Sequence, residues 1–175
     1  MEHQAENSLV FHGSPKEFDQ ELAIPKRNIR SRLDENGERK TIFDENSFHA
    51  TPHRWIALAY TYSGKPHEID GKISHYNMGV SLYDNNNEVA IYGFNSSEES
   101  LKELYGDGGY LYHFDKNNFI YKEGLGNLEV ITNDPTMPLI VERVENPVLE
   151  MKKLGVTFTF IDLALPENES YRNYY

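Results

Sequence analysis

The chain has 175 residues, enough for one domain with a buried core, and its formal net charge is −11 at pH 7. This charge argues against general binding to nucleic-acid phosphates, which requires clustered Lys and Arg. The sequence contains no cysteine, which excludes disulfides and thiolate metal sites. Its 12 Tyr and 9 Phe offer large surfaces to bury, so we expect a folded protein.

Neither end of the chain nor any apolar run predicts contact with a membrane. The first residues lack the basic region and apolar run of a secretory signal. No apolar segment approaches the roughly 18 residues that span a bilayer. We therefore predict a soluble, cytoplasmic protein with a single domain over residues 1–175 and flexible ends at 1–7 and 166–175.

The first 50 residues predict two strands separated by a loop. Residues 8–12 form a short apolar run that ends at Gly13-Ser14-Pro15, which is typical of a strand entering a turn. Residues 25–46 are polar, charged and aperiodic, with a turn signal at Asn36-Gly37, and predict a long basic surface loop. Residues 43–51 then predict a short extended segment.

A helix is expected next. Pro52 can occupy its first position with Thr51 as the N-cap, and Gly64-Lys65-Pro66 can end it. The helical spacing places four residues on one packed face: Trp55, Ile56, Ala59 and Tyr60.

The second half predicts more short strands and two short helices. Strands are expected at 73–83 and 88–94, joined by a turn at 84–87, and then at 109–114, 119–122, 128–132, 139–144 and 156–161. A capping box at 96–99 predicts a helix through Tyr105, and Asn146 with Pro147 predicts another that ends at Gly155. This mixture indicates an α+β or layered, mostly-β fold without a Rossmann fingerprint.

Three segments could carry chemistry. In Phe11-His12-Gly13-Ser14, an imidazole stands beside exposed backbone amides, and Gly13 would allow a ligand to approach the main chain closely. The alternative is an ordinary strand and turn. In residues 127–132, Glu129 alternates with apolar neighbours, so it either faces solvent or lines a cleft.

The third segment, residues 46–60, carries His49 and His53 before and at the start of the expected helix. Their spacing of four would permit metal binding within a helix, but Thr51-Pro52 places His49 ahead of the helix. The acidic partner of an HExxH motif is also missing, so we expect no metal site.

In their order along the chain, these segments resemble the ADP-ribosyltransferase superfamily of the His-Tyr-Glu type, over roughly residues 8–161. Phe11-His12-Gly13-Ser14 is similar to the first motif of that family, and Phe48-His49-Ala50-Thr51 with the helix that ends in Ala57-Leu58-Ala59-Tyr60 looks like the second. The stretch from Tyr110-Leu111-Tyr112 to Leu128-Glu129-Val130 looks like the region that supplies the glutamate. The resemblance implies an α+β fold of two packed antiparallel or mixed sheets with a few short helices.

The resemblance also implies roles for these residues in binding NAD as a co-substrate. His12 would bind a ribose hydroxyl, while Gly13 and Ser14 hold the carboxamide. Tyr60 would stack on the nicotinamide ring, and Glu129 would bind the 2′-hydroxyl of the nicotinamide ribose. The implied activity is transfer of ADP-ribose to a protein, nucleic-acid or small-molecule acceptor with release of nicotinamide.

The expected loop fits this site because it is basic. Residues 26–40 hold six Lys and Arg against three acidic residues, a local balance of 6 − 3 = +3. A loop of this kind could contact the pyrophosphate, with Arg30 and Arg32 as candidate contacts. The alternative is a solvated charged loop.

The pattern departs from the family at Phe48, where many members have Tyr, so the contact of that hydroxyl is lost. Glu123 is a second candidate for the carboxylate, but it sits in a turn-like Lys122-Glu123-Gly124 segment, which favours Glu129. The alternative function is a catalytically inactive module of the same fold that binds a nucleotide or a protein. A third hypothesis is a metal or phosphate-ester hydrolase that uses His49, His53 and His75.

Overall fold

The computed structural model of the chain describes residues 8–18, 21–61, 67–69, 72–74, 78–83, 88–94, 97–123, 125, 128–162 and 164–167. For the strands between residues 67 and 94, only the backbone is described. Several predictions fall outside these residues: the helix end at 64–66, the turn at 84–87, and the chain ends at 1–7 and 168–175.

The first sheet has the strand order β1-β8-β10 and is antiparallel throughout. Its strands are β1 (Leu9–Ser14), β8 (Gly109–Asp115) and β10 (Ile140–Val144), close to their predicted positions. The central strand β8 is almost wholly buried because it is covered on both faces. The register places His12, the predicted site histidine, opposite Tyr112.

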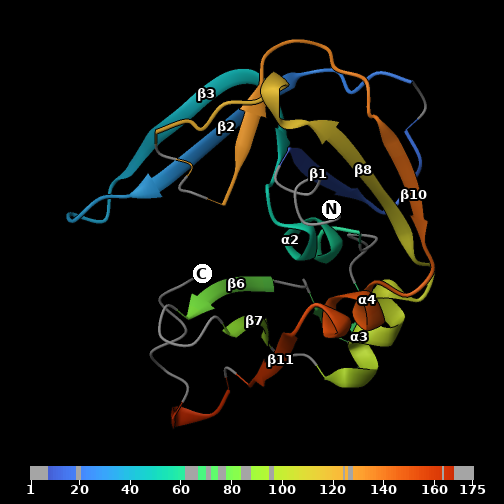
Figure 1. The fold of residues 1–175 in the computed structure, drawn as a ribbon. Helices are drawn as coiled ribbons and strands as arrows, with labels where there is room; N and C mark the ends of the chain where they lie inside the picture. Colours follow the sequence, from blue (N-terminus) through green and yellow to red (C-terminus); the bar gives the residue numbers. More distant parts are fainter. Residues whose placement is uncertain are drawn as a thin grey trace.

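The second sheet contradicts the expected loop at 25–46. Strand β2 (Lys26–Leu33) pairs with β3 (Arg39–Ala50) as an antiparallel ribbon, and β9 (Val130–Thr132) pairs with the end of β3. Figure 1 shows the ribbon extending away from the rest of the molecule. Both faces of the ribbon are mostly exposed, so its sequence lacks the alternation of apolar and polar residues that predicts a strand. Only the turn at Asn36-Gly37 is confirmed, with Gly37 at φ +76°.

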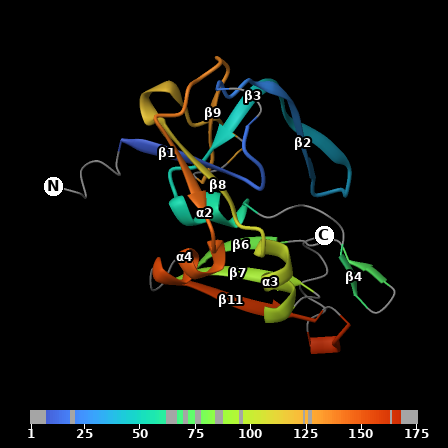
Figure 2. The same ribbon diagram turned by 90° about the vertical axis from the view of Figure 1, so that its right-hand side faces the viewer.

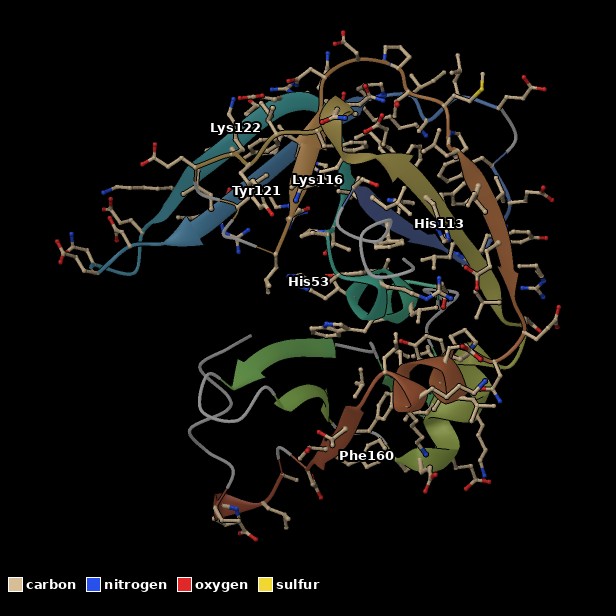
Figure 3. The ribbon with its side chains drawn as sticks, viewed as in Figure 1. His53, His113, Lys116, Tyr121, Lys122 and Phe160 are labelled. Atoms are coloured by element: carbon tan, nitrogen blue, oxygen red, sulfur yellow. The ribbon has the colours of Figure 1, made fainter. Side chains whose placement is uncertain are left out.

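Several ion pairs connect the strands of the ribbon and its turn. Arg27 donates two hydrogen bonds to Asp44, both 2.9 Å long, between β2 and β3. Lys40 pairs with Asp34 across the turn at 2.7 Å. Lys122, which lies beside the ribbon (Figure 3), pairs with Glu45 of β3. Much of the positive charge of this segment is thus neutralised by nearby carboxylates. A contact with pyrophosphate would then involve single residues rather than the whole segment.

The helix α2 (Arg54–Ala59) follows β3 and packs against β1. It starts two residues later than expected, and its N-cap is His53 rather than Thr51. Thr51 stays extended because it exchanges backbone hydrogen bonds of 2.7 and 2.8 Å with Phe11 of β1. The helix buries Trp55 and its next four residues, whereas Tyr60, predicted on the packed face, is 55% exposed.

The lower layer of the molecule combines a third sheet with two helices (Figure 2). The sheet has the order β11-β7-β6, from β6 (Met78–Tyr83), β7 (Glu88–Phe94) and β11 (Val156–Ile161), with β11 parallel to β7. The helices are α3 (Glu98–Tyr105) and α4 (Pro147–Lys153), and Asn146 caps α4 as predicted. The remaining elements are the pair β4 (His67–Ile69) and β5 (Lys72–Ser74) and the 3₁₀ turn η1 (Lys116–Asn118).

The α+β class is confirmed, but the sheet count differs from the expectation of two packed sheets. The described strands form three three-stranded sheets and a two-stranded hairpin. The extra sheet arises because the expected loop supplies β2 and most of β3. Residues 119–122, predicted as a strand, contribute only a bridge between Ile120 and Ile131. Among the described residues, no helix is long and apolar enough to cross a membrane.

Candidate functional site

A pocket of about 520 Å³ opens where β1, β3, α2 and the segment before β9 meet. This volume is in the range of small-molecule and cofactor sites, about 300–1,000 Å³. Its walls come from four separate parts of the sequence, namely Phe11, His12, Gly13, Arg30, His49, Ala50, Thr51, Ile56, Ala57, Tyr60, Leu125, Leu128 and Glu129. The structure therefore brings five predicted site residues together: His12, Gly13, Arg30, Tyr60 and Glu129.

His12 lines the pocket and carries a hydrogen-bond acceptor on its ring. Its Nδ1 lies 2.8 Å from the backbone carbonyl oxygen of His49. Since a carbonyl can only accept, Nδ1 carries the hydrogen and Nε2 of the neutral ring is an acceptor. Burial lowers the pKa of His12 by more than this hydrogen bond raises it, which keeps the ring neutral at pH 7. Nε2 has no hydrogen-bond partner among the described residues.

Glu129 is held as a carboxylate. His49 Nδ1 lies 2.5 Å from its Oε1, and Arg30 Nη2 donates to the same oxygen at 2.8 Å. Burial favours the neutral acid, but these two partners outweigh it and hold the pKa of Glu129 below its usual range. Both contacts end on Oε1, so Oε2 is available to accept a hydrogen bond from a ligand. The competing candidate, Glu123, is exposed and does not line the pocket.

Arg30 and Tyr60 give the pocket a cation and an aromatic ring. The Arg30 side chain is about half exposed and reaches from β2 to Glu129, 99 residues away in sequence. Tyr60 follows α2 directly and contributes an exposed ring to the wall. Arg32 lies on the same strand as Arg30, but its side chain is outside the described part of the structure.

Two predicted site residues do not line this pocket. The Ser14 hydroxyl turns to its own chain and donates to the Lys16 carbonyl at 2.6 Å. Phe48 alternates with His49 on β3 and therefore faces the other way, where it packs between aromatic rings in the core. The Phe48 ring packs against the His12 ring, with 4.6 Å between the two centroids, and so restrains the orientation of the imidazole.

Gly13 lines the pocket and also has a structural role. A Cβ atom at this position would lie 1.7 Å from the carbonyl oxygen of Ala57, inside α2. The missing side chain therefore lets the helix approach β1, rather than only admitting a ligand to the backbone. Because α2 leads into Tyr60, this close packing also sets the position of the aromatic ring at the pocket.

The role of His49 at this pocket is not predicted by the sequence, which offers it only as a candidate metal ligand or hydrolase residue. His49 lines the pocket and contacts Glu129 and Ser47, while its carbonyl holds His12. The sequence offers one signal for this role: His49 lies two residues after Ser47, so the two side chains share one face of a strand and can contact each other. Its contact with Glu129 spans 80 residues and could not be read from the sequence.

The described residues contain no group of three His, Asp or Glu side chains suited to a metal ion. His53 lies beside the start of α2 and His113 lies on β8, apart from it (Figure 3). His113 instead pairs with Glu142, 3.0 Å away, which also accepts two hydrogen bonds from Arg54. This cluster ties α2 to the first sheet. His75, the third histidine of the hydrolase hypothesis, is outside the described residues.

We expect acid to destabilise the protein through its buried histidines. The unfolded chain binds a proton at His12 near the ordinary pKa of 6.5, whereas the folded chain binds it only at lower pH. Stability is therefore full above about pH 6.5 and decreases as the pH falls below it. Burial also lowers the pKa values of His53 and His113, which adds to the effect.

Urea unfolding at pH 7.5 and pH 5.5 measures this dependence. His12→Asn keeps a donor near Nδ1 but cannot titrate, so its stability should decrease less steeply with acid than that of the wild type. Equal slopes in the two proteins would contradict the assignment to His12.

Comparison with protein-family models, curated proteins and solved structures finds no match to this chain.

Proposed function

We propose that the pocket binds the nicotinamide riboside part of NAD and that the protein is an ADP-ribosyltransferase with a fold of that superfamily. The observation that carries the proposal is that His12, Tyr60 and Glu129, from three distant segments, line one pocket. These are the residues that the sequence resemblance assigns to nicotinamide and its ribose.

The groups at the pocket suit this ligand chemically. His12 Nε2 and Glu129 Oε2 are two acceptors without partners among the described residues, and a ribose supplies hydroxyl donors. The Tyr60 ring offers a face for the flat cationic nicotinamide, as in other cation–π contacts. Arg30 can pair with a phosphate because its guanidinium is planar and always charged.

The same groups support cleavage of the glycosidic bond. The bond from ribose C1′ to the nicotinamide nitrogen breaks, and nicotinamide leaves as a neutral molecule with the electron pair. An acceptor nucleophile attacks C1′ and loses its proton. The transition state resembles an oxocarbenium ion, as in glycoside hydrolysis, so an ionised carboxylate near the ribose stabilises it. The lowered pKa of Glu129 keeps that carboxylate charged at neutral pH.

Incubation of the purified protein with NAD tests the proposal. We expect nicotinamide to appear on chromatography, with ADP-ribose transferred to an added acceptor or to water. NAD that remains intact at high concentration would contradict the transferase activity.

A catalytically inactive NAD-binding module is the second candidate, and one observation favours it. Arg30 and His49 both contact Glu129 Oε1. If Arg30 kept its ion pair when NAD is bound, the charge of the carboxylate would be partly neutralised. Saturable NAD binding without release of nicotinamide would support this alternative.

We expect Tyr60→Ala to weaken NAD binding about tenfold, because aromatic stacking of a planar ring is worth about 1–3 kcal/mol. Tyr60→Phe keeps the ring and should bind nearly as well as the wild type. The matched control is Tyr121→Ala, since Tyr121 is also exposed, at 53%, but does not line the pocket. Calorimetric titration measures the three affinities. Equal losses for Tyr60→Ala and Tyr121→Ala would argue against stacking at this site.

A further inference from the structure

His49 connects the two acceptors of the pocket. Its Nδ1 lies 2.5 Å from Oε1 of Glu129, and its backbone carbonyl accepts the hydrogen bond from His12 Nδ1 at 2.8 Å. One residue of β3 thus fixes the carboxylate through its side chain and the imidazole of β1 through its backbone. The resemblance to the family gives no role to this position.

The imidazole of His49 is itself held from two further directions. Its Nε2 lies 2.8 Å from the hydroxyl oxygen of Ser47, and the Phe43 ring contacts it edge-on at 5.5 Å between centroids. Phe43, Ser47 and His49 all lie on β3, and Ser47 and Phe43 are buried. A side chain restrained at both nitrogens and at its face keeps one orientation, so its hydrogen bond to Glu129 has a fixed direction.

We propose that His49 is a positioning residue, which orients Glu129 so that Oε2 meets the ribose of the ligand; this role rests on the proposed function. The hydrogen bonds of His49 and Arg30 both end on Oε1 and fix the rotation of the carboxylate about its last bond. Of these two partners, Arg30 is about half exposed and on the ribbon, whereas His49 is mostly buried. His49 is therefore the more constant support.

The chain of contacts has the atom order of a serine-hydrolase triad, from serine Oγ to Nε2 and from Nδ1 to a carboxylate. The end of this chain of contacts that would meet the ligand is the opposite one. In a hydrolase the serine meets the substrate, but Ser47 is only 4% exposed and does not line the pocket. The end that reaches the pocket is Glu129, so the carboxylate is the group that acts and the serine is the buried support.

The turnover of NAD by three variants at position 49 tests this role. Loss of a hydrogen bond that orients a metal-binding side chain costs about 10–100-fold in activity, and by analogy we expect His49→Ala to lower kcat by about that factor. His49→Asn places an amide N–H near the position of Nδ1 and should recover most of the activity. In His49→Gln, the amide lies near the position of Nε2 and contacts Ser47 instead of Glu129, so this variant should not recover activity. All three keep the carbonyl that holds His12, and the KM for NAD should change little.

A second measurement does not depend on NAD. Titration of the Glu129 carboxyl by carbon-13 NMR, assigned by comparison with Glu129→Gln, should show a higher pKa in His49→Ala than in the wild type. The reason is that the burial of the carboxyl persists while a donor is lost. His49→Asn should restore the lower value.

The two measurements separate the two proposals. A wild-type protein that binds no NAD overturns the proposed function, and the carboxyl titration then still tests whether His49 holds Glu129. An unchanged carboxyl pKa in His49→Ala, or an unchanged kcat in an active protein, overturns the positioning role. Labelling of Ser47 by a fluorophosphonate probe would also overturn it, because that result would make the serine the reacting group.

Discussion

Glu129→Gln is expected to lower the rate of nicotinamide release from NAD by about 10²–10³-fold, the usual cost of removing one preorganised charged group at a transition state. Glutamine has the same shape but no charge, so it cannot stabilise positive charge on the ribose. Its amide oxygen takes the place of Oε1, which accepts from His49 and Arg30, and its NH₂ group can donate to the oxygen of a ribose hydroxyl. NAD should therefore still bind with an affinity close to that of the wild type. The predicted signature is a large loss in kcat with a small change in KM.

The matched control is Glu123→Gln. Glu123 is the other carboxylate that the sequence offered, and it is exposed and away from the pocket. This variant should retain wild-type activity. Circular dichroism and the unfolding midpoint should show that both variants are folded, since Glu129 is only partly buried. Equal rates in Glu129→Gln and the wild type would contradict a catalytic role for Glu129.

Gly13→Ala is the second change with a large expected effect, and it acts on stability. The new Cβ would meet the Ala57 carbonyl oxygen at 1.7 Å, and this oxygen belongs to the backbone of α2 and cannot rotate away. Either α2 or β1 must shift, which we expect to cost about 1–3 kcal/mol of unfolding free energy or more. Since Tyr60 follows α2, NAD affinity should decrease in any molecules that remain folded.

Gly37→Ala separates overpacking from backbone strain. Gly37 has φ +76° but nothing within 4 Å of the position of a Cβ atom. This variant should lose only about 1 kcal/mol, the cost of a left-handed conformation for a residue with a side chain. Urea unfolding gives both free energies. A Gly13→Ala variant as stable as Gly37→Ala would show that the helix does not pack as closely as described.

The sequence predicted the parts of the fold in which local signals agree with the tertiary structure. Strand β8 is continuous and apolar, and α4 has a capping Asn, a Pro at its first position and Gly155 at its end. For the ribbon of β2 and β3 the sequence predicts a loop, and this prediction is wrong because both strands are mostly exposed on both faces. Its two strands are held together by backbone pairing, which leaves no apolar period in the sequence.

The candidate site was predictable only in part, for a related reason. The resemblance to a family supplied His12, Tyr60 and Glu129 together, and these residues do line one pocket. It also pointed to Phe48 rather than His49, although neighbouring residues on a strand face opposite ways. The choice between them depends on which face of β3 meets the segment before β9, and that is set by long-range pairing of β3 with β9.

The central claim is that this pocket binds NAD, and equilibrium dialysis of radiolabelled NAD against the Glu129→Gln variant tests it most directly. The variant should bind without consuming the ligand. We predict saturable binding of one NAD per chain, weakened in the double variant that also carries Tyr60→Ala. Absence of binding at millimolar NAD, or equal binding by the single and double variants, would contradict the claim.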